Sequence, residues 1–159
     1  MSLATTRPVG FAPEEIDLSL TTRDVPLKWV VVVDETLPAG RAVNAAVCVA
    51  SATATTVPGL RGPDAVDADG GAHAGLPWLG CTVLGAPRSR LTNLRARAAA
   101  LPAVVVADMP TQAQHTRVYT DYLEAVGGCT GGTLDYYAVS VVGPRKVVDK
   151  LTKGLSLLA

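Results

Sequence analysis

The segment from Lys28 to Ala52 constrains the fold more than any other part of the chain. It opens with an apolar run from Trp29 to Val33, in which four valines stand in a row. β-Branched side chains suit a pleated strand, and the run lacks the alternation of a half-solvated strand, so it predicts a strand buried on both faces. A polar turn, Asp34-Glu35-Thr36, follows, and the Ala/Val-rich segment opened by Pro38 predicts a helix. This succession is typical of an α/β domain.

Polar residues gather where the predicted strand ends. Asp34 and Glu35 occupy the turn, and Arg41 and Asn44 lie in the first turns of the helix. In open α/β sheets, ligands bind beside the carboxyl ends of the strands. These four residues are therefore the first candidates for a binding site, although nothing in them specifies a reaction.

The same helix carries a row of polar or reactive side chains on an otherwise apolar segment. Arg41, Asn44, Cys48 and Ser51 are three, four and three residues apart, which places them along one helix face. The row is predicted to border a cleft rather than to face open water. Cys48 and Cys81 are expected to be buried thiols, because the three cysteines lack the spacing of a zinc site or a disulfide framework.

Composition and charge set the class of protein. The 159 residues suit one domain, and with 48% hydrophobic but only 4% aromatic residues, its core must be built from aliphatic side chains. No apolar run approaches the roughly 20 residues of a membrane span, and no signal segment is recognised, so we expect a cytoplasmic protein without a membrane partner. The formal net charge of zero argues against a general nucleic-acid-binding protein. No pattern requires a cofactor or a metal.

Periodicity and turn residues predict the remaining elements. Residues 25–159 are expected to form one domain of alternating strands and helices, preceded by an N-terminal arm, residues 1–24. The predicted strands cover residues 27–33, 78–84, 103–109 and 134–142, and the predicted helices cover residues 39–53, 89–101, 111–127 and 144–158. Thr111 and Gln114 have capping-box spacing at the start of the third helix. The Gly/Pro/Asp-rich stretch of residues 55–77 is expected to be a long loop.

The N-terminal arm has a pattern of its own. Ile16, Leu18 and Leu20 alternate with polar residues, a period of two that predicts an edge strand or a segment docked on a partner. Pairing of two such arms would give a homodimer, which is one hypothesis for the protein.

Candidate acid–base groups are few. His115 lies near Asp108 and Thr111 in sequence, and a histidine beside a strand exit is able to exchange protons near neutral pH. A solvent-facing residue is the commoner interpretation, because no nucleophile motif and no second histidine at fixed spacing accompany it. His73 lies in the long loop, where a turn around Asp69-Gly70-Gly71 is preferred to a metal site.

Four arginines lie in the stretch between residues 69 and 108, which contains no acidic residue. Arg88 and Arg95 are seven residues apart, as are Arg90 and Arg97, so each pair would share a helix face. Such a face suits phosphate, but no aromatic residue is interleaved for base stacking. A solvated helix face is therefore preferred, and nucleic acid is a weakly supported partner.

Several blocks of the chain resemble known families. The strand from Lys28 to Val33, with Leu37 to Arg41 after it, resembles the opening of peptidyl-tRNA hydrolase II proteins. From about Leu27 onward, the chain more closely resembles an uncharacterised bacterial family, domain of unknown function 2000 (DUF2000), which is assigned a hydrolase-II-like fold. The blocks that carry this resemblance are Lys28 to Asp34, Asp67 to Gly70, Leu94 to Ala98, Met109 to Thr116 and Val141 to Leu151. The resemblance implies a three-layer α/β/α sandwich around a four-stranded mixed sheet.

The chain departs from the hydrolase pattern in the first helix. Hydrolase II enzymes carry a Gly-Lys pair followed by a Gln and a His, whereas Gly40-Arg41 is followed here by Ala45 and Cys48 at the matching positions. Lys28 matches the family's strand lysine. Arg41 keeps a positive charge, but it cannot act as a general base because its guanidinium stays protonated.

Three hypotheses follow. The leading one is a catalytically divergent domain that binds a small ligand or a protein partner through Asp34, Glu35, Arg41, Asn44, Thr111 and His115. The alternative is a hydrolase acting on an ester such as peptidyl-tRNA, for which the catalytic candidates are Lys28, His115 and Asp108. The third is a homodimeric assembly protein paired through the arm.

Overall fold

The structure is a computed structural model that describes residues 8–159, and its centre is a five-stranded mixed sheet. The strands are β1 (Leu27–Asp34), β4 (Thr82–Ala86), β5 (Val105–Pro110), β6 (Tyr136–Pro144) and β7 (Ser156–Leu157). They lie in the order β5-β6-β1-β4-β7. β1 and β4 are parallel, β6 is antiparallel to both β1 and β5, and β7 is antiparallel to β4. β1, β4 and β5 therefore end at the same edge of the sheet.

The valine run lies in the middle of this sheet, as predicted. Val30 to Val33 are each at most 1% exposed. Val31 and Val33 pack on one face, and Val30 and Val32 pack on the other. Because both faces are covered, the strand reads as a continuous apolar run rather than an alternating one.

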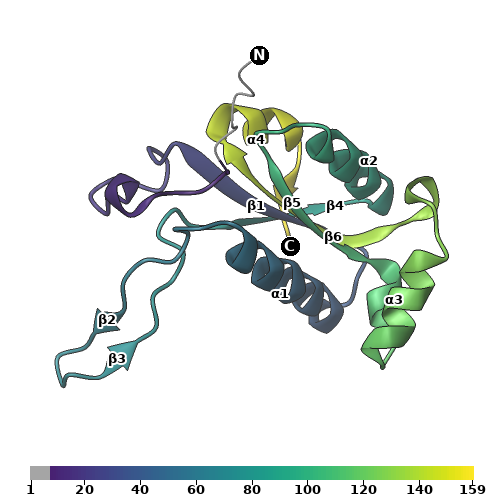
Figure 1. Ribbon diagram of the computed structural model, residues 1–159, viewed down its shortest axis with the longest axis horizontal. Coiled ribbons are helices and arrows are strands. Elements are labelled where there is room, and N and C mark those ends of the chain that lie inside the picture. Colours follow the sequence, from purple (N-terminus) through teal and green to yellow (C-terminus); the bar gives the residue numbers. More distant parts are fainter. Residues whose placement is uncertain (1–7) are drawn as a thin grey trace, which may run out of the picture.

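Four helices surround the sheet (Figure 1). α1 (Ala39–Thr56) packs on one face, whereas α2 (Arg88–Ala99) and α4 (Arg145–Leu151) pack on the opposite face. α3 (Tyr119–Gly127) stands beyond the sheet, near the beginning of α1. The helix–sheet–helix order agrees with the predicted three layers. Among the described residues, no helix is long and apolar enough to cross a membrane.

The prediction of four strands was wrong, because the end of the chain adds a fifth. The final helix stops at Leu151 rather than near residue 158. Gly154 adopts a left-handed φ of 77°, which lets the chain turn back, and Ser156 and Leu157 then pair with Gly85 and Leu84. The apolar residues after the turn continue a helical period, which concealed the short edge strand.

The predicted third helix is broken into two pieces. Thr111–Gln114 forms a 3₁₀ helix, and α3 begins only at Tyr119. The predicted capping box does not form, because Pro110 is the N-cap residue and no side chain caps this helix end. Gln114 is thereby free to contact α1 across the edge of the sheet.

The predicted long loop contains a small hairpin that projects from the body of the molecule (Figure 1). Its strands are β2 (Ala65–Val66) and β3 (Ala72–His73). The predicted turn is confirmed: the backbone N–H groups of Asp69 and Gly71 donate to Asp67 Oδ1, and Gly70 has a φ of 86°. His73 Nε2 lies 3.1 Å from Asp67 Oδ2, so the histidine side chain is bound within the hairpin.

Of the N-terminal arm, residues 1–7 lie outside the described residues. The predicted edge strand is absent from the described part, which forms a 3₁₀ helix (Pro13–Glu15) and turns. Phe11 is 6% exposed, its ring centroid lies 4.8 Å from that of Trp78, and its N–H donates to the Pro58 carbonyl. The arm therefore packs against its own domain through Phe11, and Ile16 of the alternating pattern packs against the same core.

A buried hydrogen-bond chain ties the sheet to α1. Trp29 Nε1 donates to Ser140 Oγ at 2.8 Å, and Ser140 Oγ lies 2.7 Å from Thr53 Oγ1. Thr53 Oγ1 donates to the Val49 carbonyl, so the Ser140 hydroxyl must donate to Thr53. Trp29, Thr53 and Ser140 are each at most 4% exposed. These three hydrogen bonds run in one direction and join β1, β6 and α1.

Candidate functional site

Three strands end at one edge of the sheet, and each is followed by a proline that starts a helical segment. Pro38 precedes α1, Pro87 precedes α2, and Pro110 precedes the 3₁₀ helix Thr111–Gln114. None of these helix starts has a side-chain cap or an acidic residue in its first turn. Two α-helices therefore direct the positive ends of their dipoles toward this edge without a neighbouring carboxylate of their own.

Asp34 is the buried anion of this edge. Its side chain is 0% exposed, and its Oδ2 accepts from Arg88 Nε at 2.9 Å. Its Oδ1 accepts from the N–H and the hydroxyl of Thr36, at 3.0 and 2.7 Å. Burial alone would raise the pKa of Asp34, but the bonds from Thr36 and Arg88 outweigh it and hold the pKa below its ordinary value. Asp34 therefore fixes Arg88 and the turn before α1.

Tyr137 lies between the two helix starts. It is 4% exposed, and the guanidinium carbons of Arg41 and Arg88 lie 5.1 and 5.2 Å from its ring centroid. Its hydroxyl accepts from Arg41 Nη2 at 3.2 Å and lies 2.9 Å from His115 Nε2. We call Arg41, Arg88, His115 and Tyr137 the Arg–Tyr cluster. Cation–π contacts and the two hydroxyl contacts hold three basic side chains around one ring.

Gln114 orients Arg41 from the 3₁₀ helix. Its Oε1 accepts from Arg41 Nε at 2.7 Å, and its Nε2 donates to the Arg41 carbonyl at 2.9 Å. The same Nε2 lies 3.1 Å from Asn44 Oδ1 and donates to it. One amide side chain therefore sets the positions of Arg41 and Asn44.

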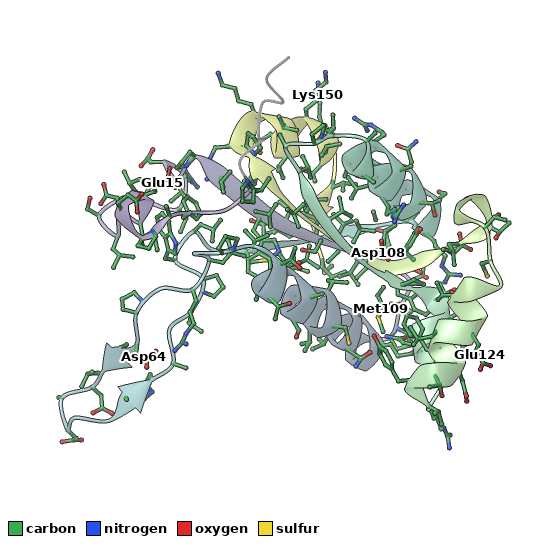
Figure 2. All side chains as sticks on the ribbon, in the orientation of Figure 1. Glu15, Asp64, Asp108, Met109, Glu124 and Lys150 are labelled. Atoms are coloured by element: carbon green, nitrogen blue, oxygen red, sulfur yellow. The ribbon has the colours of Figure 1, made fainter. Side chains whose placement is uncertain are left out.

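A groove begins beside this cluster and runs along α1. It has a volume of about 690 Å³ and lies between α1, the end of β5 and the segment that leads into α3, where Figure 2 labels Asp108 and Met109. Asn44, Cys48 and Ser51 line it, so three members of the polar row of α1 border a cleft as predicted, whereas Arg41 is not part of the lining. Cys48 is exposed in this groove and Cys81 is exposed elsewhere, so the prediction of two buried thiols was wrong.

Asp108 belongs to the wall of the groove and is already paired. Its Oδ2 accepts from Arg95 Nε at 3.0 Å, and Arg95 lies over the ring of Tyr136 at 5.8 Å. Burial raises the pKa of Tyr136, with Arg95 acting in the opposite direction. The pair occupies the opposite face of β6 from Tyr137, because neighbouring strand residues point to opposite sides.

The sequence-predicted binding residues are only partly brought together. Arg41, Asn44 and His115 meet through Gln114 and Tyr137, and Asp34 joins them through Arg88. Glu35 is exposed, and Thr111 contacts Gln112 through its hydroxyl and Asp135 through its N–H. Neither makes a hydrogen bond to the Arg–Tyr cluster within residues 8–159.

Lys28 lies at the opposite end of β1 from the candidate site. Six residues of strand, about 20 Å, separate it from Asp34. Its Nζ bonds to Asp149 Oδ1 at 2.6 Å, beside α4. The structure therefore does not place Lys28 with His115 or Arg41, as the hydrolase hypothesis requires.

Comparison with known proteins identifies a family and a similar solved structure. A family model described as "Protein of unknown function (DUF2000)" matches residues 27–159. The chain belongs to the DUF2000 family. Its structure is similar to that of Atu0240, a protein of unknown function from Agrobacterium tumefaciens strain C58, with a TM-score of 0.77 and 18% identity over 84% of this chain and 98% of that chain. This likeness shows the fold alone, and no curated protein matches the chain.

Three residues of the site in this DUF2000 protein were missed or misjudged from the sequence. Tyr137 stands inside an apolar strand, Gln114 has the spacing of a capping residue, and Arg88 was paired with Arg95 by helical period. A usable signal does exist: two predicted strands are followed by a proline and then by an arginine in the first helical turn, Arg41 and Arg88. Such a repeat at two strand ends indicates two cations at one sheet edge.

The low pKa of Asp34 predicts an acid dependence of stability in this DUF2000 protein. Because the pKa is lower in the folded state, the stabilisation is complete above the ordinary value of 3.8 and is lost as the pH falls below it. The difference in urea midpoint between the wild type and the Asp34→Asn variant should shrink over that range. An equal difference in urea midpoint at neutral pH and at about pH 2 would contradict the role given to Asp34. The variant is compared with the wild type at each pH because Asp17, Asp64 and Asp67 also have lowered pKa values and affect both proteins alike.

Proposed function

We propose that this DUF2000 protein is a non-catalytic domain that binds a small anionic ligand at Arg41. The supporting observation is the state of its guanidinium: Gln114 and Tyr137 fix Nε and Nη2, while Nη1 has no hydrogen-bond partner among residues 8–159. Within the same residues no carboxylate pairs with Arg41, whose side chain is exposed. An oriented, solvent-accessible guanidinium suits a carboxylate or a phosphate oxygen.

Three arginines of α2 are engaged. Arg88 is paired with the buried Asp34, and Arg95 is paired with Asp108. Arg90 donates to the backbone carbonyls of Lys153 and Gly154. Arg41 differs from Arg88 and Arg95 because it lacks an acidic partner among the described residues. It differs from Arg117, which also lacks one there, because Gln114 and Tyr137 hold the Arg41 guanidinium in place. The uncapped starts of α1 and α2 favour negative charge at the same edge.

Titration of the ¹⁵N-labelled full chain with sodium acetate and with inorganic phosphate tests the proposal. It predicts saturable shifts at Gln114, His115 and the first turn of α1 at low ionic strength. The two anions identify whether the site prefers a carboxylate or a phosphate group. Shifts that rise linearly without saturation, or that spread over the whole surface, would overturn the proposal.

Ester hydrolysis is a second candidate function, and one contact favours it. His115 is exposed and its Nε2 lies 2.9 Å from the Tyr137 hydroxyl, which also accepts from Arg41, so a proton-exchanging group lies beside a cation. A fold related to peptidyl-tRNA hydrolase II, proposed from the resemblance of the first strand and helix, points to peptidyl-tRNA as substrate. The test is release of the blocked amino acid from a model peptidyl-tRNA. Release by the wild type that is lost in the His115→Ala variant would show that the protein is an enzyme and would overturn the proposal of a non-catalytic binding domain.

Homodimer assembly rests on two exposed leucines of the arm. Leu18 is 56% exposed and Leu20 is 37% exposed, although Phe11 anchors the same segment to its own domain. Light scattering on the full chain and on the Leu18→Asp variant tests this hypothesis. A dimer that persists in the variant excludes Leu18 from the interface.

A further inference from the structure

The groove beside Arg41 is lined largely by apolar side chains and suits the apolar part of a ligand. Its apolar lining comes from α1, β5, the 3₁₀ helix, the residue before α3 and the start of α3 itself: Val47, Met109, Ala113, Val118, Tyr119 and Tyr122. Val47 is 60% exposed, Tyr119 is 74% exposed, and the two tyrosine rings lie 5.5 Å apart. Its volume of about 690 Å³ lies within the range of small-molecule sites.

The Arg–Tyr cluster adjoins the groove at the beginning of α1. Arg41 stands one helical turn before Asn44 in the row of α1 whose later members, Cys48 and Ser51, line the groove. One turn is about 5 Å, and Gln114 bonds to both Arg41 and Asn44. Arg41 does not line the groove itself, but it neighbours Asn44, the lining residue nearest the beginning of α1.

The charged side chains around the groove favour a negatively charged ligand. Asp108 is the acidic residue of the lining, and Arg95 neutralises it. Arg117 also lines the groove, and no carboxylate of the described chain pairs with it. With Arg41 beside it, the groove carries excess positive charge and is complementary to an anion.

We infer that the ligand is a hydrophobic organic acid, with its carboxylate on Arg41 and its aromatic or branched aliphatic body in the groove along α1. This inference rests on the proposed function, since Arg41 supplies the anion site. Burial of the body between Val47 and Tyr122 removes apolar surface from water on both partners. The acid group fixes orientation, and the apolar groove provides most of the affinity.

The test compares acetate with 1-naphthylacetate, which carries the same charge on a larger body. The readout is the ratio of their dissociation constants, because a change in the anion site affects both acids alike. We expect 1-naphthylacetate to bind the wild type at least about tenfold more tightly than acetate. Val47→Trp, which fills the groove, should reduce this ratio to about two or less, and Tyr119→Ala should reduce it in part.

Val66→Trp is the matched control, because Val66 is 69% exposed on the hairpin and should keep the wild-type ratio. Circular dichroism establishes that each variant is folded. A ratio near one in the wild type, with saturable acetate binding that depends on Arg41, would overturn this inference and leave the proposed function standing. A tenfold ratio that survives Val47→Trp and Tyr119→Ala would also overturn it. Failure of both acids to bind saturably would instead remove the proposed function.

Discussion

Replacing Ser140 by alanine should destabilise the fold by about 2–3 kcal/mol, since it leaves a buried donor without a partner. Trp29 Nε1 donates to Ser140 Oγ, and the next link reaches Thr53 of α1. Alanine restores neither contact, and the indole that loses its acceptor is only 4% exposed. Thr53 loses less, because it keeps its bond to the Val49 carbonyl. Urea unfolding monitored by circular dichroism measures the change.

Two comparisons separate this hydrogen bond from general disturbance of the core. Thr152 is also buried, but its hydroxyl donates only to the Val148 carbonyl of the preceding helical turn. Thr152→Ala should therefore cost about 1 kcal/mol or less. Combining Ser140→Ala with Trp29→Phe should cost less than the sum of the single changes, because the unpaired donor is then removed. If Ser140→Ala and Thr152→Ala lowered the free energy of unfolding equally, the buried hydrogen bonds assigned to Trp29, Ser140 and Thr53 would be contradicted.

Arg41→Gln should weaken the binding of acetate or phosphate at least about tenfold, and up to about a hundredfold. A hydrogen bond to a charged group contributes about 1.5–3 kcal/mol, and glutamine retains a polar side chain without the charge. Unfolding stability should change little, because Arg41 is exposed and its partner Gln114 stays near the surface. Isothermal titration at low ionic strength measures the affinity.

Arg90→Gln is the matched control for this change. Among the described residues, Arg90 hydrogen-bonds only to the carbonyls of Lys153 and Gly154, and it has no contact with the Tyr137 ring such as Arg88 makes. Both variants lower the net charge equally, so a general electrostatic effect would weaken binding to the same extent in each. Equal losses in Arg41→Gln and Arg90→Gln would show that the anion is held by the overall field rather than by the oriented guanidinium.

The pattern of apolar residues in the sequence predicted the buried strands and helices well. Continuous valines predicted β1, and the apolar face after Pro38 predicted α1. The edges were predicted less well. β7 has two residues and depends on pairing with Leu84 and Gly85, a contact that sequence periodicity does not register. The break after Gln114 was missed because capping-box spacing and a helical period pointed to one helix.

The candidate site was predictable only where one element carried it. Asn44, Cys48 and Ser51 lie on a single helix, so their spacing was enough to place them beside a cleft. Tyr137 joins the site through residues 96 and 22 positions away in sequence, Arg41 and His115. Such contacts depend on strand order, which the sequence does not specify. Lys28 was proposed as a catalytic candidate from the family resemblance alone, although its place at the start of the strand already put it far from Asp34.

The most direct test of anion binding is the ¹⁵N spectrum of the arginine side chains, recorded with and without acetate. If Arg41 holds the anion, the Nε and Nη signals of Arg41 shift and saturate together with the amide signal of Gln114, while the signals of Arg90 stay in place. An Arg41 signal that does not move while another arginine responds saturably would contradict the claim that Arg41 holds the anion.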